Sequence, residues 1–116
     1  MMILVAGPYR SGTNDDPTLI AANMRSMNEA ALALVRAGHL ALTGEAVALP
    51  LVDLAGSERI GDAAWDALMH PIGRLLAARC DAVLRIGGPS RGADEMVEIA
   101  QANGKAVFYH LQDVPG

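Results

Sequence analysis

The fold is decided by the stretch from Asp81 to Glu95, which reads DAVLRIGGPSRGADE. Its first six residues are mostly apolar and predict a buried strand. The glycines and the proline between Gly87 and Gly92 interrupt any regular element, and helical periodicity resumes at Ala93. The stretch therefore predicts a strand, a glycine-rich loop and a helix. The first backbone amides of such a helix are unpaired and attract anions.

The remainder of the chain repeats this alternation of strand and helix. Asp16 before Pro17 predicts the start of a helix that runs to about Ala37, with Gly38 as its stop. Short apolar runs predict further strands over residues 2–6, 39–43 and 105–109. We expect one α/β domain over residues 1–116. Its flavodoxin- or Rossmann-like three-layer fold would hold a mostly parallel sheet of four to five strands in the order 2-1-3-4.

The segment from Gly44 to Gly61 has the weakest pattern. Residues 45–54 predict an apolar loop with a helical turn, which is apolar enough to contact a second subunit. A helix is predicted from about Asp62. Pro71 lacks a backbone donor and disfavours helical geometry at the residue before it, so we expect a kink or two abutting helices there.

Composition narrows the classes of partner. The 116 residues are 52% hydrophobic and 19% charged, which suits one domain with a real core. A net charge of −4 without a basic cluster, and only 3% aromatic residues, argue against a nucleic-acid polymer as partner. No apolar run has the ~20 residues of a membrane span, and the first run is too short for a signal peptide. Because Cys80 is the only cysteine, we expect a reducing, cytoplasmic setting.

Two loops are predicted to meet at one edge of the sheet. Ligands of such sheets bind at the carboxyl ends of the strands where the winding reverses, here between the first and third strands. The loops at that point, over residues 7–16 and 87–92, both carry glycine, arginine and hydroxyl groups. These groups suit a phosphate or a sugar. The predicted ligand-binding residues are Gly7, Tyr9, Arg10, Gly88, Ser90, Arg91 and Gly92.

Several carboxylates are candidates for chemistry. Glu95 falls on the first turn of the helix after the glycine loop, either as a nucleophile or as an ordinary helix-start acid. Asp62, Asp66 and His70 recur at four-residue steps, as an acid/base or metal cluster or, the favoured interpretation, as a solvated face. Glu45 follows the second strand, where it either reaches the same edge of the sheet or, the favoured interpretation, is a surface-loop acid.

Common catalytic and cofactor motifs are missing from the chain. The glycine loop matches neither G-x-G-x-x-G nor the Gly-Lys-Ser/Thr ending of a P-loop. The sequence therefore argues against an ATPase. No G-x-S-x-G supports a serine hydrolase. The three histidines show no metal-ligand spacing. We therefore expect neither a metal nor a cofactor.

Short motifs in the chain resemble the nucleoside 2-deoxyribosyltransferase superfamily, in particular its small DUF4406-like branch. They are VAGPY at 5–9, CDAV at 80–83 and SRGA at 90–93 before an acidic helix start, and they follow the family's order over nearly the whole chain. The resemblance implies a flavodoxin-like fold in homodimers or larger oligomers, with sites often completed by the neighbouring subunit. It implies a small-molecule nucleoside or nucleotide as ligand, no metal, and cleavage or exchange of the N-glycosidic bond. In such chemistry a carboxylate attacks the anomeric carbon and a second acid helps the base to leave.

Two positions depart from the pattern of that superfamily. Its glutamate lies four residues after a loop glycine, which is Met96 here, and a shift of one residue to Glu95 turns a side chain by about 100°. Its aspartate corresponds to Gly73. Two functions therefore stay open. One is an N-glycosidase or transferase with Glu95 and Asp66 as catalytic residues. The other is a non-catalytic sensor or binding module for a nucleotide-derived ligand.

Overall fold

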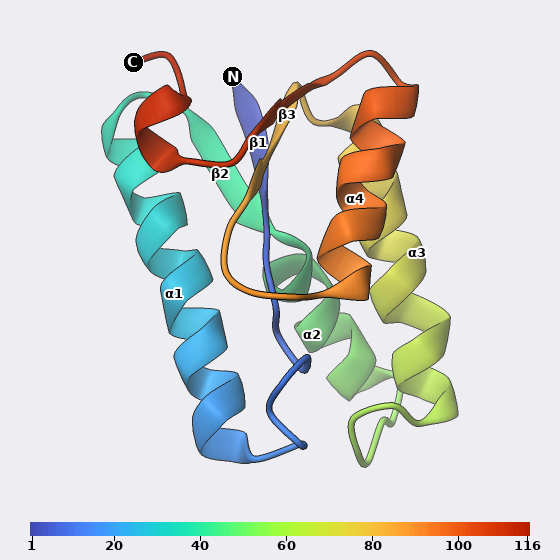
Figure 1. Ribbon diagram of the computed structural model, residues 1–116. Helices are drawn as coiled ribbons and strands as arrows, with labels where there is room; N and C mark the ends of the chain where they lie inside the picture. The colour runs from blue at the N-terminus through green and yellow to red at the C-terminus, as the bar shows by residue number, and fades with distance from the viewer.

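A parallel four-stranded sheet forms the centre of the protein, in a computed structural model that describes residues 1–116 (Figure 1). The strand order is β2-β1-β3-β4, which confirms the predicted order and the α/β class. Ile3 of β1 pairs with Ala41 of β2 on one side and with Ala82 of β3 on the other. The strands are β1 (Met2–Ala6), β2 (Leu40–Thr43), β3 (Ala82–Arg85) and β4 (Ala106–Phe108).

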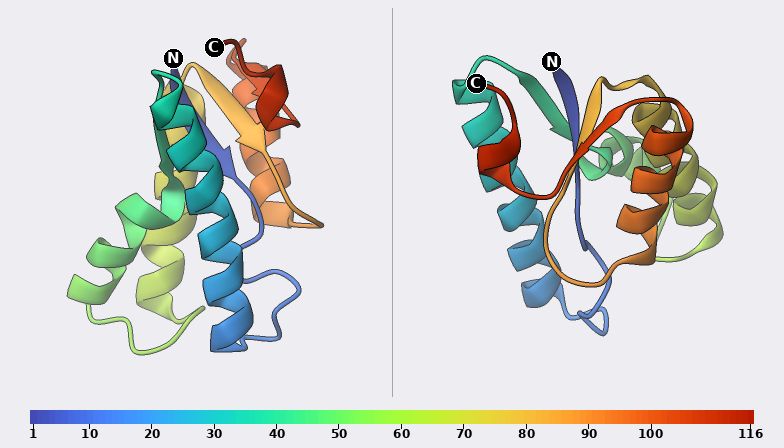
Figure 2. Two further views of the ribbon diagram at one scale, coloured as in Figure 1. Left: turned by 90° about the vertical axis from the view of Figure 1, so that its left-hand side faces the viewer. Right: turned by 45° about the horizontal axis from the view of Figure 1, so that its top comes forward.

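Helices cover both faces of the sheet. The helix α1 lies on one face, α3 and α4 lie on the other, and α2 packs against α3 (Figures 1 and 2). Asp16 caps α1 by accepting a hydrogen bond from the Thr18 amide, and Pro17 takes the first helical position, as predicted. The helices are α1 (Pro17–Arg36), α2 (Gly44–Leu54), α3 (Ala63–Arg79) and α4 (Arg91–Ala102), followed by a 3₁₀ turn over Leu111–Asp113. None of these helices has the length and apolar character needed to cross a membrane.

The core has two halves, one on each face of the sheet, because successive strand side chains point to opposite faces. On the α1 side, Ile3, Val5 and Leu84 pack with Met27 and Leu34. On the α3–α4 side, the sheet packs against the face of α4 that the periodicity predicts to be buried, which consists of Ala93, Met96, Val97 and Ala100. The first turn of α4 is thereby fixed above the carboxyl end of the sheet.

The segment after β2 differs from the prediction, because it forms a full helix instead of an apolar loop. Thr43 is both the last residue of β2 and the N-cap of α2, and its Oγ1 accepts a hydrogen bond from the Ala46 amide at 3.0 Å. Ala48 and Val52, four residues apart, form the buried side of α2. Pro50 removes only one backbone donor, and tertiary packing offsets that loss.

Of the kink or pair of abutting helices predicted at Pro71, the pair of helices is wrong. The helix α3 continues through Pro71 from Ala63 to Arg79. One hydrogen bond is lost at a proline, but α3 packs against both α2 and α4, and Gly44 of α2 and Met96 of α4 both lie close to Gly73, two residues after Pro71. Because α3 stays continuous, Asp66 and His70 remain on one helical side, in line with the cavity described below.

Candidate functional site

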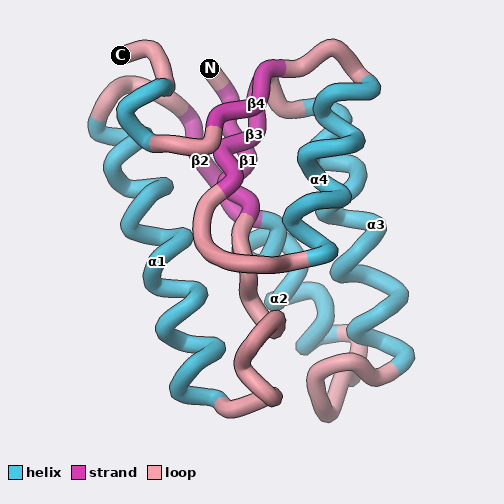
Figure 3. The backbone as a smooth tube through the Cα atoms, viewed as in Figure 1, coloured by secondary structure: helices cyan, strands magenta, loops and turns pink.

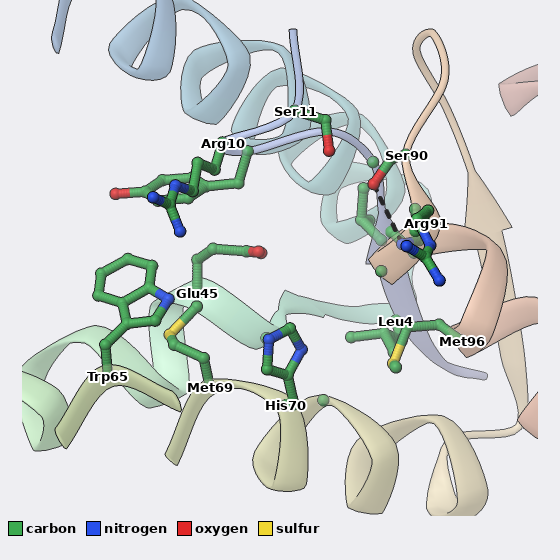
Figure 4. A pocket seen from close by; sticks show the side chains of 18 of the residues that line it. Leu4, Arg10, Ser11, Glu45, Trp65, Met69, His70, Ser90, Arg91 and Met96 are labelled. Carbon is green, nitrogen blue, oxygen red and sulfur yellow. Dashed lines mark hydrogen bonds between the residues drawn. The ribbon is translucent and has the colours of Figure 1, made fainter. Parts of the chain in front are cut away.

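The loops after β1 and β3 lie next to each other at the carboxyl end of the sheet (Figure 3). A cavity of about 310 Å³ opens there. Side chains from both loops, from the first turn of α2, from α3 and from the first turn of α4 surround it (Figure 4). Two of the predicted site residues, Gly88 and Glu95, lie outside its lining. The predicted residues that line it are Gly7, Tyr9, Arg10, Asp66, Ser90, Arg91 and Gly92.

Arg85, the last residue of β3, hydrogen-bonds to the glycine loop and to the first turn of α4, and its role was not predicted from the sequence. This side chain is only 8% exposed, and its Nε donates to Asp94 Oδ1 at 3.0 Å. Its Nη2 donates to the Gly88 carbonyl at 2.9 Å, so that carbonyl is already engaged within the loop. The sequence did contain a signal for this role, since Arg85 is the one charged residue in an otherwise apolar strand. A guanidinium buried in a sheet must be paired with an acceptor.

Two glycines bring the loops together by close approach. Gly87 has a φ of +78°, and a methyl group there would lie 2.6 Å from Pro8 Cδ. On the other loop, a methyl group at Gly7 would lie 3.0 Å from the Ile86 carbonyl oxygen. The glycine content of both loops therefore has a packing cause in addition to any contact with a ligand.

The guanidinium of Arg10 is fixed at the rim of the cavity. Its Nε and Nη2 donate to the two carboxylate oxygens of Asp15 at 2.7 and 3.0 Å, and this pairing lowers the pKa of Asp15. A methyl group at Gly61 would lie 2.5 Å from Arg10 Nη1, so the arginine rests across the loop between α2 and α3. Arg91, at the first position of α4, makes no ion pair within the chain.

Glu45 reaches the same edge of the sheet as the two loops, and the favoured sequence interpretation of it as a surface-loop acid is wrong. It is the second residue of α2, it is only partly exposed, and it lines the cavity. Burial raises the pKa of the Glu45 carboxyl, because an ionised carboxylate loses hydration there. Burial and the nearby charge of Glu45 also raise the pKa of Tyr9.

The three residues spaced at four-residue steps on α3 have different roles. Asp62 caps the helix: its Oδ1 accepts from the Trp65 amide at 2.9 Å and from Ser57 Oγ at 2.8 Å. These hydrogen bonds, with those from the amides of Glu58 and Arg59, lower the pKa of Asp62 to about 2. Asp66 and His70, by contrast, line the cavity. A capping aspartate is therefore separated from a carboxylate and an imidazole that a ligand can reach.

The acid next to the glycine loop points away from the cavity. Glu95 Oε1 lies 3.3 Å from Arg74 Nη1 in a partly exposed ion pair. Met96 takes the inward position at 8% exposure, and a methyl group on Gly73 would lie 3.2 Å from its sulfur. The two departures from the superfamily pattern are thus one contact, in which the Met96 thioether fills the space above Gly73.

An aromatic pair closes the end of the cavity near α3. The rings of Tyr9 and Trp65 stack with their centroids 6.0 Å apart at an interplanar angle of 23°. Trp65 is 8% exposed, and both residues line the cavity. Sequence reasoning missed Trp65, because its position beside Tyr9 depends on how the 55–62 segment places the start of α3.

The site combines cations, acids and aromatic rings around one hollow. A scan against protein-family models and a search of curated proteins found no match to this chain. No group of three or more histidine, cysteine, aspartate or glutamate side chains is arranged to hold a metal ion. The lining suits a ligand that is anionic at one end and planar or apolar at the other.

Proposed function

We propose that the cavity binds a nucleoside or nucleotide. The observation that carries this proposal is the unpaired guanidinium of Arg91 beside the amino end of α4, across the cavity from an aromatic pair. Figure 4 draws Ser90 and Arg91 on one side of the hollow and Trp65 on the other, with Glu45 and His70 between them. A volume of about 310 Å³ lies at the small end of the range typical for small-molecule sites.

The two ends of the cavity favour different parts of such a ligand. The amino end of α4 carries a partial positive charge, and Arg91 adds a full one, which favours a phosphate. Arg10 is less suited to this role, since Asp15 already neutralises it. The resemblance to nucleoside 2-deoxyribosyltransferases supports the same class of ligand.

The proposal is tested by calorimetric titration with nucleosides, their 5′-monophosphates and inorganic phosphate. We expect monophosphates to bind, and Arg91→Ala to weaken them about tenfold or more, as expected for a lost charge-assisted hydrogen bond. Arg25→Ala is the matched control, because Arg25 pairs with Glu29 on the exposed side of α1. Absence of binding by every nucleoside and nucleotide contradicts the proposal.

A second candidate function is cleavage of the N-glycosidic bond. It is favoured by the presence of Glu45 and Asp66 in one lining, whereas Glu95 is paired with Arg74 outside it. In this scheme the Asp66 carboxylate bonds to the anomeric carbon as the bond to the base breaks, and the Glu45 carboxyl, which burial favours in its neutral form, gives its proton to the leaving base. Water then releases the sugar from Asp66 and returns a proton to Glu45.

This second function is tested by measuring base release from deoxynucleosides and deoxynucleotides. Release that Glu45→Gln abolishes and Glu95→Gln leaves unchanged supports Glu45. The reverse result assigns the nucleophile to Glu95, as the sequence pattern predicts. Binding without any base release identifies the chain as a non-catalytic binding module.

Self-association through α2 is also part of the proposal. Val47, Leu51 and Leu54 are exposed at three- and four-residue spacing on this helix, and Leu54 is 85% exposed. A homodimer or larger homo-oligomer would cover this apolar row. Solution mass measurement tests the idea. We expect a dimer or larger species that Leu51→Glu converts to a monomer, and a strictly monomeric wild type contradicts it.

A further inference from the structure

We infer that Tyr9 and Trp65 form a two-ring clamp that opens to hold the planar base of the ligand between them. The inference rests on the proposed function, because it assumes that a nucleotide enters the cavity. It adds where the base lies and which side chain moves to admit it.

The spacing of the two rings carries this inference. Their centroids are 6.0 Å apart and their planes are 23° from parallel. A planar ring held in contact with both needs about 7 Å between them, twice the contact distance of ~3.5 Å between carbon atoms. The Tyr9 ring must therefore move away from Trp65 to admit a base, and this movement exchanges one aromatic contact for two.

The two rings differ in how firmly they are held. Trp65 lies on the first turn of α3 at 8% exposure, and its amide donates to the capping Asp62. Tyr9 lies in the loop after β1, it is half-buried, and its hydroxyl makes no hydrogen bond within the chain. Its backbone is anchored, since Asn23 Nδ2 donates to the Tyr9 carbonyl at 2.9 Å. Trp65 is thus the fixed wall, and the Tyr9 side chain is the part that moves.

The location of the pair fits a base better than core packing alone. Both rings line the cavity, and neither is a member of the two buried clusters of the core, although Tyr9 packs against the edge of the cluster on the α1 side. Trp65 and Arg91 lie at opposite ends of the hollow (Figure 4). A base between the rings therefore leaves the phosphate directed toward the amino end of α4.

The single tryptophan of the chain allows a direct test by fluorescence. The full chain is titrated with the 5′-monophosphates of adenosine, guanosine, cytidine and uridine, and with ribose 5-phosphate, in fluorescence and calorimetry. We expect at least one nucleotide to quench Trp65 emission at saturation, and ribose 5-phosphate to bind without quenching. Tyr9→Leu should weaken that nucleotide about tenfold, the effect of losing one base–aromatic stack, and leave ribose 5-phosphate within twofold.

Two further variants control for folding. Tyr9→Phe keeps the ring and should bind as the wild type does. Tyr109→Leu removes the other tyrosine, which is exposed and outside the cavity lining, and should change nothing. Nucleotide binding without quenching, or equal weakening of nucleotide and ribose 5-phosphate by Tyr9→Leu, overturns the clamp and leaves the proposed function standing. Failure of these nucleotides and of the corresponding nucleosides to bind overturns both.

Discussion

Two helices begin at the carboxyl edge of the sheet, α2 after β2 and α4 after β3, and a hydroxyl side chain caps each of them. Thr43 Oγ1 accepts from the Ala46 amide, and Ser90 Oγ accepts from the Ala93 amide. Both helices carry acids near their start. In α2 that acid, Glu45, lines the cavity, but in α4 Asp94 pairs with Arg85 and Glu95 with Arg74, outside it.

The length of each junction explains this difference. No residue separates β2 from α2, so the second helical residue is fixed directly above the strand end. Five residues, 86–90, separate β3 from α4, and the register of the helix is set by its apolar face instead. Burying that face turns Met96 inward and leaves Glu95 to the nearest cation. Whether an acid in the first turn of a helix points into a site therefore depends on the length of the strand–helix junction and on which face of the helix is buried.

The largest change in stability is expected when Met96, the residue of α4 that points inward, is replaced. Met96→Ala should lower the free energy of unfolding by about 3 kcal/mol, since it empties a buried methionine site that Gly73 cannot fill. Glu95→Ala should cost less than about 1 kcal/mol, because its ion pair with Arg74 is partly exposed. Urea unfolding of the two variants measures both values. Similar losses would show that the register of α4 does not depend on its apolar face.

A smaller effect is expected at the β3–α4 junction itself. Gly87→Ala should destabilise the protein by about 2 kcal/mol, because a methyl group there would meet the Pro8 ring at 2.6 Å in a left-handed backbone conformation. Gly88→Ala is the adjacent control and should stay within about 0.5 kcal/mol, since no atom lies within 4 Å of the added carbon. Thermal and urea unfolding report both variants. Equal tolerance at the two positions would rule out close approach as the reason for Gly87.

Local signals made the fold and part of the site predictable. Apolar runs predict β1 to β4, and a glycine follows each of the first three within two residues. The helical periodicity of α4 predicts its buried residues. Loop residues such as Tyr9 and Ser90 were found because each lies in the loop that follows β1 or β3. Trp65 and Arg85 were missed because their roles depend on contacts with segments distant in sequence.

The position of Glu45 and the contact between Met96 and Gly73 could not be predicted from the sequence either, because both depend on how the helices pack. Glu45 reaches the cavity only because α2 begins at Gly44, and the apolar residues with Pro50 concealed that helix. Met96 and Gly73 could each be recognised as a departure from a pattern. That they touch follows only from the packing of α3 on α4.

The smallest expected effect depends on pH and concerns Glu45. Burial raises its pKa in the folded protein above the unfolded value, so ionisation costs the folded state more than the unfolded chain. Stability linked to this group is fully present below the ordinary glutamate pKa and is lost as the pH rises through the folded value. Glu45→Gln cannot ionise, so its melting temperature should match that of the wild type near pH 4 and exceed it at neutral pH.

Asp62→Asn provides the control with the opposite sign. The folded pKa of Asp62 is about 2, below its ordinary value, so its charge stabilises the protein above that ordinary value and stops doing so as the pH falls toward 2. This variant should be less stable than the wild type at neutral pH and converge with it in acid. Melting curves collected from pH 2 to 8 separate the two cases. A Glu45→Gln variant that is less stable than the wild type at neutral pH would mean that a cation stabilises the Glu45 carboxylate in the cavity. The contrast between the α2 and α4 junctions would then be one of ion-pair partner and not of burial.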